Sequence, residues 1–301
     1  MEILLGEDEF AKQIAERLGL EFVKVNTFTF PDSEIKPIIE NEDRIKNKEV
    51  LVVVRTDRFK PNIGDSILKI YFICRTLKKL NCEISLFLPW MFYSRQDKKF
   101  LPGEPESLFD IANLYELLGI KNIFTINSHL YGKENPLQSY FKKIKIHDIS
   151  SAKMFADYLK TKKLVKPIVI GPGEGPSVMV KELAKLLSAP YECFEKERDH
   201  KTLKVFFKRP KSDFKNRDVI IYDDIAATGW TIVKPFEMIK EQKPNRIFIA
   251  LCHMVTKEAI ERLYKLNSDE IITTDSFVSE EPANFKKISL AHLIANHLFL
   301  P

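Results

Sequence analysis

Asp223 and Asp224 directly follow a run of apolar and aromatic residues, Val219 to Tyr222, and precede a turn of small residues. Thr228 and Thr231 flank the end of that turn, where an amphipathic run begins. Adjacent carboxylates accept hydrogen bonds from hydroxyl pairs such as a ribose diol, and amides at a helix start bind phosphate. The stretch therefore predicts a ribose phosphate site, the alternative being an ordinary strand end whose aspartate caps the turn.

A second polar cluster, Tyr93–Phe100, follows the apolar run Leu86–Phe92. Its side chains combine cations suited to a polyphosphate with groups for directed hydrogen bonds: Arg95, Lys98, Lys99, Gln96 and Asp97. A solvated charge run is the alternative for such a stretch. Its place just after a predicted strand favours ligand binding, because open parallel sheets bind ligands at the carboxyl ends of their strands.

Composition limits the classes of protein to consider. The 301 residues are 45% hydrophobic and 30% charged, which allows one large or two medium domains. No apolar run approaches the roughly 20 residues of a membrane helix, and we expect no signal peptide. The four cysteines form no C-x-x-C pair, which fits a reducing cytoplasm. The net charge of +5 is mild, so we expect small anionic ligands and neither nucleic acid nor membrane as partners.

Short apolar runs alternate with longer amphipathic runs along the whole chain. Because the short runs are apolar throughout, they predict strands of parallel sheets covered on both faces. The fold class is therefore α/β. The expected strands include 2–6, 49–54, 82–90, 121–127, 166–172, 218–224, 245–253 and 270–276, and the expected helices include 8–19, 64–80, 106–119, 176–187, 230–242 and 256–266.

The stretch VIIYDDIAATGWT, Val219–Thr231, resembles the phosphoribosyl pyrophosphate (PRPP) loop of type I phosphoribosyltransferases and of PRPP synthetases. Three further segments favour the synthetases, also called ribose-phosphate diphosphokinases. FPDSEI (Phe30–Ile35) is similar to their F-P-D-G-E segment, and YSRQDKKF (Tyr93–Phe100) to their Y-A-R-Q-D-K-K segment for ATP. EKER (Glu195–Arg198) resembles their catalytic flexible loop. Their order fits that family over essentially the whole chain.

The resemblance implies a role for each segment. ATP would be contacted by Phe30, Asp32, Glu34, Arg95, Gln96, Asp97, Lys99 and His129. Ribose 5-phosphate would be held by Asp223, Asp224, Ala226, Ala227, Thr228, Gly229 and Thr231. Lys196 and Arg198 would be catalytic and stabilise charge on the transferred group. In the family the FPDSEI-like segment approaches the adenine from a neighbouring subunit, so the resemblance also implies a homo-oligomer.

Mg²⁺ is the cofactor that the resemblance implies, and here the sequence departs from the family. His129 matches the family's histidine near ATP and magnesium, but the residues after it do not follow H-x-x-Q-I. Gly173 stands where the family has a metal-linked aspartate, and the neighbouring Glu174 is the candidate substitute. Trp230 stands where the family has a small residue.

The resemblance implies two similar phosphoribosyltransferase-like domains. We predict an N-terminal domain over 1–145 for ATP, completed by segment 288–301, and a C-terminal domain over 146–287 with the PRPP loop. The implied activity transfers pyrophosphate from ATP to C1 of ribose 5-phosphate. Two alternatives stay open: a type I phosphoribosyltransferase, which needs neither YSRQDKKF nor a second domain, and a catalytically weak regulatory subunit, which the loss of aspartate at Gly173 favours.

Overall fold

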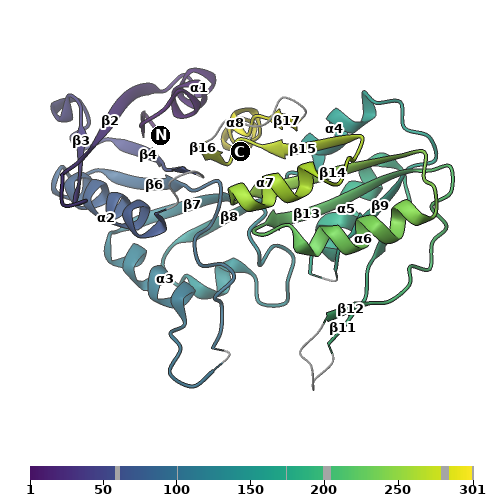
Figure 1. Cartoon of the computed structure of the whole chain (residues 1–301). Helices are drawn as coiled ribbons and strands as arrows, with labels where there is room; N and C mark the ends of the chain where they lie inside the picture. Colours follow the sequence, from purple (N-terminus) through teal and green to yellow (C-terminus); the bar gives the residue numbers. More distant parts are fainter. Residues whose placement is uncertain (58–61, 100, 174, 199–204, 279–284, 300–301) are drawn as a thin grey trace. The chain divides into compact units, whose positions relative to one another are not determined.

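The computed structural model describes residues 1–57, 62–99, 101–173, 175–198, 205–278 and 285–299. The chain divides into two compact units (Figure 1). Unit 1 consists of Met1–Ile149 and Ser289–Pro301, and unit 2 consists of Ser150–Ile288.

Unit 1 contains a seven-stranded sheet of order β3-β2-β1-β4-β6-β7-β8. Neighbouring strands are parallel except β2 and β3, which are antiparallel. Its strands are β1 (Ile3–Gly6), β2 (Glu21–Thr29), β3 (Ile35–Ile39), β4 (Glu49–Val53), β6 (Glu83–Phe87), β7 (Ile120–Ile126) and β8 (Lys145–Ile149), besides the two-residue β5 (Thr56–Asp57). The 3₁₀ turns are η1 (Glu42–Arg44) and η2 (Leu137–Tyr140).

Helices cover both faces of this sheet. Helices α1 (Glu9–Leu18) and α8 (Ala291–Phe299) pack together on one face, and α2 (Ile63–Lys79) and α3 (Ser107–Leu117) cover the other (Figure 1). Residues Val50 to Val53 of the central strand β4 are all buried. Burial on both faces explains why the strand runs are continuously apolar.

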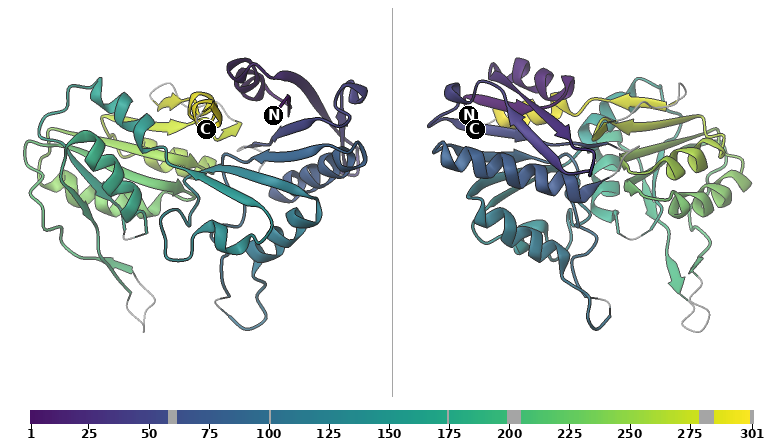
Figure 2. Two further views of the ribbon diagram at one scale, coloured as in Figure 1. Left: turned by 180° about the vertical axis from the view of Figure 1, so that it is seen from behind. Right: turned by 60° about the vertical axis from the view of Figure 1, so that its left-hand side comes forward.

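Unit 2 contains a six-stranded, all-parallel sheet of order β10-β9-β13-β14-β15-β17. Its strands are β9 (Ile168–Gly171), β10 (Tyr191–Cys193), β13 (Asp218–Ala226), β14 (Arg246–Met254), β15 (Glu270–Thr274) and β17 (Phe285–Ile288), besides the two-residue β16 (Phe277–Val278). Strands β11 (Lys196–Arg198) and β12 (Val205–Phe207) form a separate antiparallel pair. Helices α4 (Ala152–Lys160) and α5 (Ser177–Leu187) cover one face, and α6 (Trp230–Glu241) and α7 (Lys257–Tyr264) cover the other (Figures 1 and 2).

The strand order of unit 2 reverses between β9 and β13. From β9 the chain passes through α5 to β10 on one side, and from β13 through α6 to β14 on the other. In open parallel sheets such a switch point opens a crevice at the carboxyl ends of the two strands, where ligands bind. The fold therefore directs attention to the ends of β9 and β13.

The expectation of two α/β units with mostly parallel sheets is confirmed. The division along the chain differs from the predicted boundary at 145/146 by four residues, because β8 pairs with β7 and so extends unit 1 to Ile149. Helix α8 lies in unit 1, where it packs on α1. A membrane-crossing helix is absent from the described part of the chain, since none of its helices is both long and apolar enough.

Candidate active site

Asp223 and Asp224 lie at the switch point of unit 2. Strand β9 pairs with β13 only as far as Ile221, whereas pairing with β14 continues to Ala226. The two aspartates therefore stand where β13 extends past its neighbour. Both are buried, at 6% and 7% exposure, and the Asp224 amide donates to the Asp223 carboxylate at 3.0 Å. Two carboxylates at such an edge suit a polyhydroxylated ligand.

The turn after β13 is fastened by the segment that joins β14 to α7. The Val255 amide donates to the Ala226 carbonyl at 3.0 Å, and the Thr256 hydroxyl donates to the Ala227 carbonyl at 2.5 Å. In a planar trans peptide the C=O and the following N–H point in opposite directions. The amides of Ala227 and Thr228 therefore face away from the start of α7.

Helix α6 begins at the end of this turn. Gly229 precedes it with φ of 77°, a conformation that favours glycine. Thr228 and Thr231 are exposed on either side, so both hydroxyls are accessible beside the first amides of the helix. Amides, hydroxyls and the positive end of the helix dipole together form a site suited to a phosphate group.

The β11–β12 pair is anchored at the same edge of the sheet. The Phe194 amide, just after β10, donates to the carbonyl of Gly171 at the end of β9, at 2.9 Å. The ring of Phe194 is buried and meets Phe207 edge-on at 6.3 Å. The predicted catalytic residues Lys196 and Arg198 lie on β11, so their backbone starts from this anchor.

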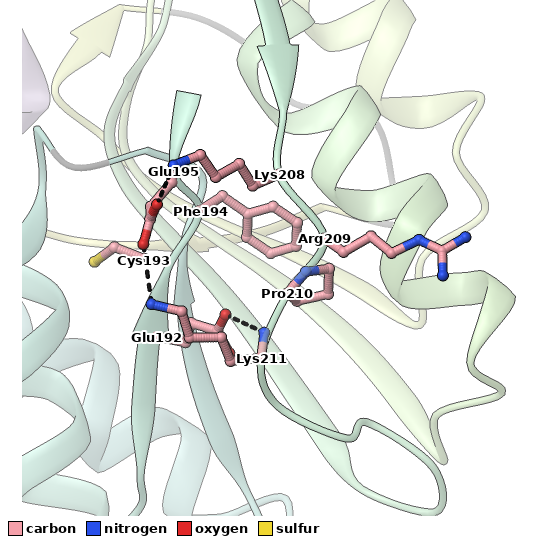
Figure 3. Close-up of a pocket in the computed structure, with 8 residues that line it drawn as sticks. All are labelled: Glu192, Cys193, Phe194, Glu195, Lys208, Arg209, Pro210 and Lys211. Atoms are coloured by element: carbon pink, nitrogen blue, oxygen red, sulfur yellow. Dashed lines mark hydrogen bonds and ion pairs between the residues drawn. The ribbon is translucent and has the colours of Figure 1, made fainter. Parts of the chain in front are cut away.

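Residues 192–195 and 208–211, which we call the root of the β11–β12 pair, line a cavity of about 70 Å³, and most of them are charged (Figure 3). The Glu195 carboxylate lies 2.9 Å from the Lys208 ammonium and 3.0 Å from the Lys211 ammonium. Hydrogen bonds from Lys208 and Lys211 lower the pKa of Glu195 to about 2. Glu192 accepts from the Lys211 and Ser212 amides. These ion pairs and hydrogen bonds join the two chain segments on either side of the cavity. We therefore assign the cavity a structural role, as the support of the β11–β12 pair.

The predicted metal partner Glu174 lies outside the described residues. It follows β9, whose last residue, Gly171, leaves no space for a side chain, since an added Cβ would lie 2.8 Å from the Cys193 sulfur. Gly173 brings no carboxylate to this edge. Among the described residues no three His, Cys, Asp or Glu side chains gather to form a metal site.

In unit 1 the described part of the predicted ATP segment, Tyr93–Lys99, and the His129 loop lie at one edge of the sheet. They follow the neighbouring parallel strands β6 and β7, and the Ile126 amide donates to the Pro89 carbonyl at 3.2 Å. Arg95, Gln96 and Lys99 are exposed, and Asp97 is half-buried. The Gln96 side-chain oxygen accepts from the Ser107 hydroxyl at 2.7 Å, which ties the segment to the start of α3.

The His129 loop is fixed by Asp148 of β8. The Ser128 amide and hydroxyl both donate to the Asp148 carboxylate, at 3.0 and 2.5 Å. The Ser128 hydroxyl also accepts from the Leu130 amide at 3.2 Å, so both neighbours of the half-buried His129 are held.

Phe30, Asp32 and Glu34 occupy the exposed turn between β2 and β3. Glu34 donates its amide to the Asp32 carboxylate at 3.1 Å, and Ser33 adopts φ of 74° where the family segment has glycine. Strands β1 and β4 separate β2 from β6, which places them roughly 14 Å apart at the usual strand spacing. Unit 1 therefore does not bring Phe30 beside Arg95 at adjacent strand ends.

The strand order of unit 1 also reverses, between β1 and β4, but the residues there pair with one another. The Arg55 Nε lies 3.0 Å from the Asp8 carboxylate, and its guanidinium carbon stacks 4.2 Å from the Phe10 ring centroid. The Lys69 ammonium lies 2.5 Å from the Glu7 carboxylate. The protein's own ion pairs thus occupy the position that carries the glycine-containing turn in unit 2.

Sequence reasoning missed the residues that support the predicted site. Thr256 and Asp148 carry no recognisable motif, and each acts on a segment distant in sequence. Only for Thr256 was there a local signal, since it precedes an amphipathic run and caps α7 by accepting from the Ala259 amide at 3.1 Å.

Comparison with known proteins matches both units. Residues 3–119 match the model for the N-terminal domain of ribose phosphate pyrophosphokinase, and residues 141–286 match the phosphoribosyl transferase domain. The chain is 30% identical to the ribose-phosphate pyrophosphokinase of Sulfurisphaera tokodaii over 97% of both chains. It is 31% identical to that of Methanosarcina mazei, covering 96% of this chain and 91% of that protein.

A solved structure has the same fold. The phosphoribosylpyrophosphate synthetase from Mycobacterium smegmatis aligns with a TM-score of 0.84 at 22% identity, covering 99% of this chain and 97% of that chain. The resemblance that the four segments predicted is therefore confirmed over the full length, and the chain belongs to the ribose-phosphate pyrophosphokinase family.

Proposed function

We propose that this protein converts ATP and ribose 5-phosphate to AMP and PRPP. The C1 hydroxyl oxygen of the sugar attacks the β-phosphorus of ATP and loses its proton. The bond from the β-phosphorus to the oxygen that bridges it to the α-phosphorus breaks. AMP leaves with that oxygen, and the pyrophosphoryl group moves as a unit.

One observation carries the sugar half of this proposal. The switch point of unit 2 combines two buried carboxylates with a turn whose amides face away from α7. Asp223 and Asp224 hold the ribose diol. The amides and hydroxyls of Ala226–Thr231 hold the 5-phosphate. Both contacts fix the C1 hydroxyl at the carboxyl edge of the sheet.

Lys196 and Arg198 stabilise the transferred group. Both lie on β11, which is anchored through Phe194 to the end of β9 at the same edge. Cations in this role act by positioning and by electrostatic stabilisation, the main protein contributions to phosphoryl-type transfer.

Unit 1 provides the ATP contacts. Arg95, Gln96, Asp97 and Lys99 bind from the segment after β6, together with His129 from the loop after β7. Phe30, Asp32 and Glu34 bind the adenine of a neighbouring subunit in a homo-oligomer. The exposed Phe28 and Phe30 rings, stacked edge-on at 4.9 Å, support such a contact, because a partner would cover them.

Mg²⁺ fits the groups that are present. This ion usually binds through one or two protein groups and substrate phosphates, without a dedicated protein cage. The lack of a three-residue cluster among the described residues agrees with that mode. His129 and Glu174 are the candidate protein groups. When bound, the ion offsets phosphate charge.

An assay of the purified protein tests this function. ATP, ribose 5-phosphate and Mg²⁺ should yield AMP and PRPP in equal amounts, and the product should be absent without the sugar. A protein that binds both substrates and forms no AMP would overturn the proposal. That outcome would favour a catalytically weak regulatory subunit, the second candidate, which Gly173 in place of the family's aspartate supports.

A further inference from the structure

The turn after β13 has a third support besides Val255 and Thr256. The Arg262 guanidinium, on α7, donates to the Thr228 carbonyl. Three consecutive carbonyls, Ala226 to Thr228, thus accept hydrogen bonds from one segment of eight residues, 255–262. Side-chain donors supply two of the three bonds, so the peptide orientation of the turn depends on residue identity at 256 and 262.

Arg262 is itself held in place from two sides. Its guanidinium lies 2.6 Å from the Glu258 carboxylate, one helical turn earlier, and its central carbon lies 4.1 Å from the centroid of the Trp230 ring. The Arg262 side chain is 20% exposed although Glu258 and Trp230 are 57% and 61% exposed. Stacking on an aromatic face suits the planar guanidinium and would not be reproduced by lysine.

The contact with Thr228 determines the direction of one amide. Because the peptide is planar and trans, holding the Thr228 carbonyl toward α7 directs the Gly229 amide the opposite way. Gly229 has φ of 77° and packs closely on Leu263, where an added Cβ would lie 3.4 Å from the side chain. A glycine turn released from Arg262 would sample other orientations, because glycine has the widest conformational freedom.

We propose that Arg262 is a positioning residue for the phosphate turn, locked by Trp230 and Glu258. It keeps the Gly229 amide directed toward the phosphate without touching the substrate. Trp230, bulky where the family has a small residue, stacks on the guanidinium and excludes water from one of its faces. The inference rests on the proposed function only in naming ribose 5-phosphate as the ligand. The chemistry it requires is a phosphate group.

Steady-state kinetics separate positioning from general stability. Arg262→Ala should raise the KM for ribose 5-phosphate about tenfold or more, the usual effect of losing a charged hydrogen bond. The KM for ATP and the kcat at saturating sugar should change less than twofold. Arg262→Lys, which keeps a donor and loses the stack, should recover part of the loss. Trp230→Ala should show a smaller increase in the same KM, and Trp230→Phe less still.

The same helix provides the matched control. Lys257 and Glu261 form an ion pair at 3.8 Å with the same spacing as Glu258 and Arg262, and both are exposed. Lys257→Ala removes that pair without a contact to the turn. It should leave both KM values unchanged. If Arg262 had a purely structural role, Arg262→Ala would lower the fraction of active protein, and therefore the apparent kcat, and would leave the KM for the sugar unchanged.

A binding measurement gives a readout that does not need turnover. The chain has two tryptophans, so Trp230 is the only one left in a Trp90→Phe background. Titration with inorganic phosphate should change its emission, and adding Arg262→Ala should raise the half-maximal phosphate concentration at least tenfold. Calorimetry with inorganic phosphate on the proteins with both tryptophans gives the same comparison if Trp90→Phe fails to fold.

The two measurements separate the possible failures. If Arg262→Ala binds phosphate tenfold more weakly than the wild type, the positioning role is supported. If in addition the wild type forms no AMP, the proposed reaction is refuted while the positioning role stands. Equal phosphate affinity in wild type and Arg262→Ala overturns the positioning role. No phosphate effect on the wild type overturns it as well, because the turn would then not bind the group that Arg262 is inferred to orient it for.

Discussion

Aspartates at the two ends of β13 have different surroundings. Asp218, at the amino end, is fully buried and accepts from the Val165 amide, Asn245 and Arg246. Burial alone would raise its pKa, but the Arg246, Val165 and Asn245 hydrogen bonds lower it overall. Such a carboxylate serves the fold. Asp223 and Asp224 stand instead at the edge where the strand extends past β9.

Changing both edge aspartates to asparagine should weaken ribose 5-phosphate use and spare the fold. A lost charged hydrogen bond costs roughly 1.5–3 kcal/mol, so the KM for the sugar should rise about tenfold to hundredfold. Asp218→Asn is the matched control, because it leaves Arg246 without its charged partner and should lower the unfolding free energy. Unchanged sugar kinetics in the Asp223/Asp224 double variant would refute the diol assignment.

The placement of the β11–β12 pair depends on the ion pairs at its root. Glu195, immediately before β11, joins its carboxylate to Lys208 and Lys211 on the returning segment. Because the pKa of Glu195 is lowered to about 2, the contribution of this ion pair to stability is fully present above the ordinary pKa of 4.5 and is lost as the pH falls toward 2. Near neutral pH the Glu195 carboxylate is therefore ionised.

Glu195→Gln should loosen this root and reduce kcat more than it changes either KM. The proposed catalytic residues start one position later, so their placement depends on the root. Hydrogen exchange at the Lys208 amide, which donates to the Glu195 carbonyl at 3.0 Å, should become faster. Glu237→Gln, which breaks the exposed pair with Lys234 at 3.4 Å, should have neither effect. Equal exchange at Lys208 in both variants would count against the role of Glu195.

Helix α8 meets the edge of its sheet through histidines. His147 stacks on Phe124 at 4.4 Å and meets His297 of α8 edge-on at 5.7 Å. Burial, together with Lys145 and His297, lowers the pKa of His147, and burial lowers that of His297. Both rings therefore favour the neutral form in the folded protein, and protonation opposes their contact.

The stability of unit 1 should fall as the pH drops below about 6.5. Histidines with depressed pKa values stabilise the fold fully above the unfolded value of 6.5, and this contribution is lost as the pH falls through the lower folded values. His147→Phe keeps a stacked ring and removes one titrating group. Urea unfolding between pH 5 and 8 should show a shallower pH dependence in this variant. An identical dependence would exclude His147 as a source.

At the scale of the whole molecule, two similar sheets have different switch points. In unit 2 the switch point carries two carboxylates and the glycine-containing turn. In unit 1 it is occupied by the Arg55–Asp8 and Lys69–Glu7 pairs. We expect unit 1 to bind through the loops after β6 and β7 instead, which accounts for two α/β units of the same class with different proposed ligands.

A core substitution in one unit should destabilise that unit and not the other. Ile294 of α8 is fully buried in unit 1, and Ile239 of α6 is fully buried in unit 2. Either isoleucine-to-alanine change should cost about 2–5 kcal/mol of unfolding free energy. Ile294→Ala should accelerate hydrogen exchange in α1 and β1, and Ile239→Ala in β13 and β14. Faster exchange in unit 2 caused by Ile294→Ala would contradict the assignment of α8 to unit 1.

The sequence alone predicted the central strands, the start of α6 and the family. Continuous apolar runs predicted the central strands, because strands buried on both faces exclude polar residues. The predicted strand 218–224 is found as β13 and continues two residues further, to Ala226, and α6 begins at Trp230, where the amphipathic run does. The resemblance of four polar segments to those of a known family, in the same order, predicted the family, and the relatives confirm it.

Tertiary structure decided which distant residues meet. The sequence of α8 does not indicate that this helix packs on α1, because an apolar helix face does not specify which other element it will pack against. Arg262 lies in an ordinary charged helix, yet its guanidinium reaches a carbonyl 34 positions away and stacks on Trp230. Amide direction in the turn likewise depends on hydrogen bonds from another element. Sequence by itself specified the groups available for chemistry, whereas their orientation arises only when packing brings separate strands and helices to one edge of the sheet.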